Sequence, residues 1–123
     1  MHNKKVNLAK KFELFKDQWS PKIVGQLNGQ YIKLAKIEGE FDWHAHGQED
    51  ELFMVVKGAL IIKLGDHDIQ LEEGEFFIVE RGIKHKPIAK NECWVMLFEP
   101  KETGHTGNLQ TDRTVAVEDQ EWI

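Results

Sequence analysis

The stretch WHAHGQEDELFMVVKGAL, Trp43–Leu60, contains the clearest signals for both fold and chemistry. His44 and His46 are separated by one residue, and acidic residues follow them. Side chains two positions apart on a strand point to the same face, so these two imidazoles can bind one ion. The apolar pattern from Glu51 predicts the next strand, which Gly58 ends. The stretch therefore predicts either a metal site on a sheet or a polar turn that happens to hold two histidines.

Short strands are also predicted on both sides of this stretch. The runs KIVGQL and QYIKLAKI flank Asn28-Gly29, a dipeptide typical of a two-residue type I′ hairpin. Further apolar runs, including FDWHAH, FFIV, KHKPIA and CWVMLF, are separated by glycines and acidic turns. About eight or nine short strands with frequent turns predict an all-β sandwich or barrel. Strands do not alternate with long helices, which argues against a parallel α/β sheet.

The two ends of the chain differ from this pattern. Residues 7–19 carry apolar side chains at steps of four, three and four, which predict an amphipathic helix with Asn7 as its N-cap and Pro21 beyond its end. Residues 99–123 form a polar, weakly patterned tail, in which TVAV and Trp122 could dock a final segment. The apolar stripe consists of Leu8, Phe12, Phe15 and Trp19.

Composition limits the classes of protein that the chain can belong to. Its 123 residues predict a single domain over 1–123, and 41% apolar with 30% charged residues is an ordinary globular balance. A formal net charge of −5 argues against nucleic acid as a partner. No long apolar run indicates a membrane span or secretory signal. Cys93 is the only cysteine, which fits a reducing compartment, so we expect a cytoplasmic protein.

A carboxylate and a third imidazole extend the candidate metal site. Glu51 shares the strand face of Phe53, whereas Asp50 lies in the turn, so Glu51 is preferred and Asp50 is the alternative. His85 opens a later strand in RGIKHKP. Three imidazoles and one carboxylate suit a divalent ion of zinc, iron, manganese, nickel or cobalt. The remaining histidines, which we expect to be ordinary polar residues, are His2, His67 and His105.

Two motifs in this sequence resemble those of the cupins. GEFDWHAHGQEDELFMVVKG has the family's HxH pair followed by Glu51 and Gly58 at the family spacing, although the first glycine is one residue closer to the histidines. GEFFIVERGIKHKPIA has the glycines and His85 of the second motif. Glu80 stands where the family usually has proline, and Ala89 where it often has asparagine. The resemblance covers about residues 31–98.

The resemblance implies a double-stranded β-helix, which is a jelly-roll barrel, and a homodimer. It also implies a metal held inside one mouth of the barrel by His44, His46, Glu51 and His85. Both faces of CWVMLF are apolar, so we expect the barrel core to cover one and the N-terminal helix or a partner subunit to cover the other. Phe41 and Trp43 are expected on the face opposite the histidines.

Two classes of function follow from such a site. Four protein ligands leave an octahedral ion two positions for a bidentate oxygen ligand, which suits a metal-dependent enzyme that acts on a small oxygen-rich molecule. Among cupins, the resemblance implies a dioxygenase or a sugar isomerase, and no catalytic base is assigned from the sequence. The alternative is a non-catalytic cupin module that binds or senses a small molecule.

Overall fold

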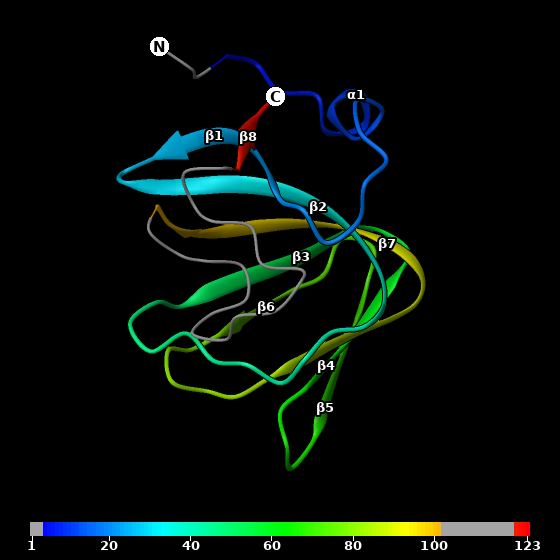
Figure 1. The fold of residues 1–123 in the computed structure, drawn as a ribbon, viewed down its shortest axis with the longest axis vertical. Helices are drawn as coiled ribbons and strands as arrows, with labels where there is room; N and C mark the ends of the chain where they lie inside the picture. The colour runs from blue at the N-terminus through cyan, green and yellow to red at the C-terminus, as the bar shows by residue number, and fades with distance from the viewer. Residues whose placement is uncertain (1–3, 102–119) are drawn as a thin grey trace.

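The computed structural model describes residues 4–101 and 120–123, and it confirms an all-β fold with one short helix (Figure 1). The strands form one eight-stranded sheet that wraps around an apolar interior. The elements are α1 Leu8–Phe12, β1 Lys22–Leu27, β2 Gln30–Glu40, β3 Glu51–Lys57, β4 Ala59–Lys63, β5 Asp68–Glu72, β6 Phe76–Val79, β7 Lys86–Pro100 and β8 Glu121–Trp122.

Strand β7 connects the parts of the barrel. It pairs with β2 along most of its length, with β4 through its first residues and with β3 through its last ones, while β6 pairs with β3 (Figure 1). We expected KHKPIA and CWVMLF to be separate strands with a turn at Lys90–Glu92. Instead these three residues stay inside β7 as an exposed irregularity where the register with β2 shifts. A bulge of this kind bends a strand without ending it.

The hairpin between β1 and β2 is confirmed. Asn28 and Gly29 have φ angles of 50° and 74°, as the two central positions of a type I′ turn require. At Gly58, between β3 and β4, both the backbone conformation and the available space require glycine. Its φ is +91°, and an added Cβ would lie 3.1 Å from the Glu92 carbonyl oxygen. A larger residue there would push β3–β4 away from β7.

The two faces of β7 are buried in different ways. Cys93, Val95 and Leu97 belong to the barrel core, and burial raises the pKa of the Cys93 thiol to about 12, so this cysteine behaves as a small apolar side chain. The opposite face carries Trp94, which stacks on Phe12 with ring centroids 4.7 Å apart. The N-terminal segment therefore covers the face for which we considered either the helix or a partner subunit.

The N-terminal helix is much shorter than predicted, because it ends at Phe12 and not at Trp19. Asn7 is the N-cap and accepts a hydrogen bond from the Lys10 backbone amide, as expected. Beyond the helix, the Phe15 carbonyl accepts a 2.7 Å bond from buried Lys36 Nζ. A tertiary contact thus replaces a helical hydrogen bond. Phe15 can then pack under the N-terminal segment while Trp19 reaches the barrel interior.

The last described residues join the sheet. β8 pairs in parallel with β1, and the Ile123 amide donates to the Ile23 carbonyl at 3.0 Å, so the segment with Trp122 docks on the sheet, which the sequence had left open. The TVAV segment, residues 114–117, lies outside the described residues. Within the described residues, no helix is long and apolar enough to cross a membrane.

Candidate metal site

A short backbone bridge joins the two motifs. His44 and His85 each donate their amide to the other's carbonyl, at 3.0 and 2.9 Å, and the Gly82 amide donates to the His46 carbonyl at 2.8 Å. The FDWHAH segment was expected to be a full strand, but it forms only this isolated bridge. The bridge places the rings of His44 and His85 with centroids 4.3 Å apart.

Glu51 supplies the carboxylate and Asp50 does not. Glu51 is the first residue of β3 and is buried on the same face as Phe53, as strand alternation predicted. Asp50 is exposed and accepts a 2.8 Å hydrogen bond from the Arg81 amide. Its carboxylate therefore stabilises the turn before His85 and lies outside the cluster.

The structure brings the four predicted residues together in the barrel interior. One ligand-capable atom from each of His44, His46, Glu51 and His85 lies within 4.8 Å of those of the others. Each residue exposes at most 4% of its surface. Four buried donors at this separation could hold a metal ion, and their role as ligands stays a prediction.

Hydrogen bonds to backbone carbonyls orient two of the imidazoles. Nδ1 of His44 lies 2.9 Å from the Asp42 carbonyl oxygen, and Nδ1 of His85 lies 3.0 Å from that of Ile83. A carbonyl only accepts, so each Nδ1 carries the hydrogen and Nε2 is the ring nitrogen left to bind an ion. This arrangement is typical of metal-binding histidines.

The lone pairs of the cluster converge. Glu51 Oε1 lies 3.2 Å from His46 Nε2 and 3.8 Å from His85 Nε2, and within the described part of the chain these buried atoms find no hydrogen-bond donor. Facing acceptors repel each other unless a proton or another cation lies between them. The donor set therefore fits a divalent ion, which would satisfy all of these atoms at once.

The charges of the cluster follow from burial and from Glu51. Burial, together with neighbouring His85, lowers the pKa of His44 to about 4, so this ring is neutral near pH 7. Burial alone would lower the pKa of His46, but the facing carboxylate of Glu51 outweighs it and raises that pKa. Burial alone would raise the pKa of Glu51, but the neighbouring side chains of Glu99, His46 and His85 hold it well below its usual value.

Two buried charged residues behind Glu51 were missed from the sequence. Glu99, which we placed at the start of the polar tail, is on β7 and fully buried, and Lys33 Nζ lies 2.8 Å from its carboxylate. Burial and the charge of Glu51 raise the pKa of Glu99 well above its usual value, so a protonated Glu99 can donate a hydrogen bond to Glu51. The strand alternation Cys93, Val95, Leu97 continues to Glu99 and could have revealed it.

Other polar positions stay outside the cluster. His67 is exposed and pairs with Asp66, while His2 and His105 lie outside the described residues. Glu80 is exposed, and its carbonyl accepts from the Ile83 amide in a turn. The residue that replaces the family's proline is thus a turn residue facing solvent.

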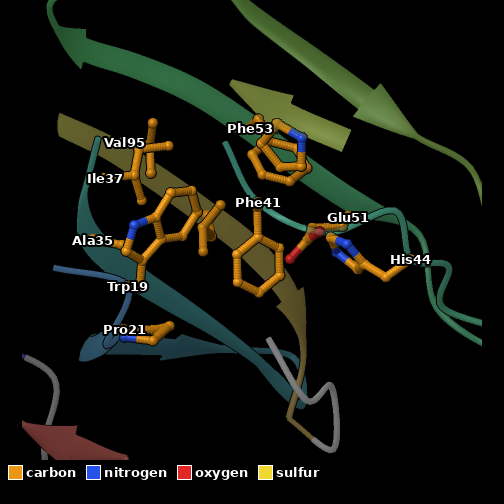
Figure 2. Close-up of a pocket in the computed structure, with 11 residues that line it drawn as sticks. Trp19, Pro21, Ala35, Ile37, Phe41, His44, Glu51, Phe53 and Val95 are labelled. Atoms are coloured by element: carbon orange, nitrogen blue, oxygen red, sulfur yellow. The ribbon is translucent and has the colours of Figure 1, made fainter. Parts of the chain in front are cut away.

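A cavity of about 40 Å³ adjoins the cluster inside the barrel (Figure 2). His44 and Glu51 line one end, and Trp19 and Phe41 line another part, with their rings stacked at a centroid distance of 4.7 Å. The expectation for Phe41 was wrong: it is buried beside His44, whereas Trp43 is partly exposed. Strand alternation failed because residues 41–50 do not form a regular strand.

The comparisons with known proteins agree with this fold. The family profile described as the cupin domain matches residues 30–98. The chain is 44% identical to a cupin-2 domain containing protein from Shewanella frigidimarina NCIMB 400, with a TM-score of 0.76 over 77% of this chain and 93% of that one. It is 28% identical to protein NMB1881 from Neisseria meningitidis, with a TM-score of 0.73 over 79% and 99% of the two chains.

One relative with a similar sequence is itself described as uncharacterized, so it does not indicate a function. The uncharacterized protein YdbB of Bacillus subtilis (strain 168) is 33% identical over 64 residues, which are 51% of this chain and 57% of that protein. The chain thus spans little more than half the length of this relative. Because the cupin profile covers more than half of the chain, the protein belongs to the cupin family, and the predicted jelly-roll barrel is confirmed.

Proposed function

We propose that this cupin binds a divalent metal ion through His44, His46, Glu51 and His85 and is a metal-dependent enzyme acting on a small oxygen-bearing molecule. The observation that carries the proposal is the convergence of buried, unpaired acceptor atoms within 4.8 Å. A buried polar group without a partner is costly, so such convergence is expected only where a ligand satisfies it. Iron, manganese, nickel, zinc and cobalt all suit this donor set.

The surroundings of the cluster bear on the type of reaction. A bound ion would supply Lewis-acid or redox chemistry to an oxygen ligand in the adjoining cavity. A sugar isomerase also needs a base near the reacting carbon. Among the described residues that line the cavity, only His44 and Glu51 can take up a proton, and both are proposed ligands. This favours the dioxygenase type over the isomerase type.

The same observation supports the second candidate, a binding module without turnover. A cavity whose described lining offers no acid or base beyond the proposed ligands can hold a small molecule without converting it. If the protein binds a ligand tightly and does not convert it with the metal in either oxidation state, the result would favour the binding module. Oxygen consumption that depends on a redox-active ion would favour the enzyme.

The test of metal binding is metal content by mass spectrometry on untagged protein. We expect near-stoichiometric metal in the wild type and its loss in the double variant His44→Ala/His46→Ala. The matched control is His67→Ala, which removes an exposed imidazole and should leave the metal content unchanged. Equal metal content in the double variant, or none in the wild type after reloading, would contradict the proposal.

The homodimer and the cytoplasmic location remain proposals. The outer face of β7 no longer supports a dimer, because the N-terminal segment covers it. Phe76, Ile78 and Ile83 expose between 44% and 59% of their surfaces and offer a different apolar face to a second copy. Exposed apolar groups that cluster in this way are typical of interaction surfaces.

A further inference from the structure

The polarity of the side chains that line the cavity limits which ligands can bind there. Among the described residues, the lining apart from His44 and Glu51 consists of apolar side chains such as Ala35, Phe53 and Val95, with Trp19 as the only other one that has a polar side-chain atom (Figure 2). That indole N–H already donates to the Glu38 carbonyl at 3.1 Å. A hydroxyl group in the cavity would therefore find no free side-chain partner among the described lining residues away from the cluster.

The size of the cavity sets a second limit. On a scale where about 10–15 Å³ holds one water molecule, its 40 Å³ accepts about three or four groups of that size. This is room for a short aliphatic body but not for an aromatic ring or a sugar chain.

Trp19 forms one wall of the cavity, and several contacts hold it there. Its backbone has a φ of 60°, which is uncommon for a bulky residue. Its amide donates to the Lys36 carbonyl at 2.9 Å, and its indole both bonds to Glu38 and stacks on Phe41. A side chain held in an unfavourable backbone conformation by tertiary contacts often has a function. Trp19 is thus placed to limit the length of a ligand.

We propose that this cavity selects small molecules with a bidentate oxygen head and a compact apolar body, such as short-chain 2-oxo acids, and that Trp19 sets the upper size limit. This inference rests on the proposed function, because the head would bind the ion while the body fills the cavity. It separates the protein from cupins that act on sugars, whose hydroxyl groups this cavity leaves unpaired.

The experiment uses the full chain loaded with Co²⁺ and measures binding by isothermal titration calorimetry. The probes are 2-oxobutanoate and 3-hydroxy-2-oxopropanoate, which share the chelating head and differ only by a methyl group in place of a hydroxyl. We expect 2-oxobutanoate to bind at least tenfold more tightly. Equal affinity, tighter binding of the hydroxylated acid, or no binding of either acid to the loaded protein would overturn the inference.

Two variants test the walls of the cavity separately. Ala35→Val adds two methyl groups beside the cavity and should weaken 2-oxobutanoate binding at least tenfold, whereas the control Ala59→Val, at an exposed position of β4, should not change it. Trp19→Ala should allow phenylpyruvate to bind, which the wild type should reject. Unchanged size selection in Trp19→Ala would overturn the role of Trp19 even if Ala35→Val did not fold.

Metal content measured on each sample separates the two proposals. Stoichiometric cobalt with no preference for the apolar acid would overturn only the inference about the cavity. Failure to take up cobalt would overturn the proposed function and this inference with it.

Discussion

Two buried polar regions lie on opposite faces of this sheet. The polar groups of one have hydrogen-bond partners, whereas those of the other have none within residues 4–101 and 120–123. On the outer side, Lys36 donates to the Phe15 carbonyl at 2.7 Å and lies 4.7 Å from the centre of the Trp94 ring. On the inner side, His46 and His85 direct Nε2 at the same oxygen of Glu51, without a donor among the described residues. The comparison shows that burial of a polar group does not by itself indicate function. A satisfied group stabilises the fold, whereas converging unsatisfied acceptors indicate a site for a cation.

Removing His85 should have the largest effect. We expect His85→Ala to weaken metal binding by at least about 100-fold, since loss of a residue that merely orients a ligand already costs about 10- to 100-fold. The rise in Tm on adding metal should disappear as well, because that rise depends on binding to the native state. Competition titrations and melting curves with and without metal measure both effects. Unchanged metal affinity would mean that the inner region is not the four-ligand site.

Lowering the pH should weaken metal binding through His46. The pKa of His46 is raised, so below it this ring holds a proton that a metal ion must displace. Metal affinity should then fall about tenfold per pH unit for each competing proton as pH decreases through that pKa. His44, with a pKa of about 4, competes only in more acidic solution.

Calorimetric metal titrations between about pH 5 and pH 8 measure this dependence. A constant affinity over that range would contradict the geometry of His46 and Glu51. His46→Gln, which cannot take up the proton, should flatten the profile and separate this effect from other titrating groups.

Replacing Lys36 should affect stability and leave metal binding unchanged. Lys36→Met leaves the Phe15 carbonyl without its buried donor, so we expect the free energy of unfolding to fall by about 1–3 kcal/mol. Lys57→Met is the matched control, since exposed Lys57 also lies over the Trp94 ring but has no such bond within the described residues, and its loss should be about 0.5–1 kcal/mol. Urea unfolding of both variants checks the difference. A change in metal content in Lys36→Met would mean that the two regions are not independent.

Local patterns were sufficient for much of the fold and for the composition of the candidate site. The Asn28-Gly29 hairpin depends only on two residues that tolerate positive φ. Strand alternation was sufficient to place Glu51 inside and to separate the faces of Cys93 and Trp94. The spacing of the two motifs was sufficient to select four residues from all the polar residues of the chain. The structure brings these four together: His44, His46, Glu51 and His85.

Alternation also marks the limits of that prediction. It placed Phe41 on the wrong side, because it holds only while the chain is extended and residues 41–50 are not a regular strand. Helical periodicity likewise predicted too long a helix, because the bond from Lys36 to Phe15 competes with the next helical turn. No local pattern in the sequence reveals the irregular segment 41–50 or the early end of the helix.

The sequence by itself determined most of the strands, the inner and outer faces of β3 and of the second half of β7, and the four side chains proposed to bind one ion, because these depend on residue spacing along the chain. Only the tertiary structure decided that Trp19 and Phe41 close an apolar cavity beside the cluster, and that Lys33 and Glu99 lie behind Glu51. These residues come from strands and segments far apart in the chain. Their contacts depend on how the barrel closes, so residue spacing along the sequence cannot reveal them.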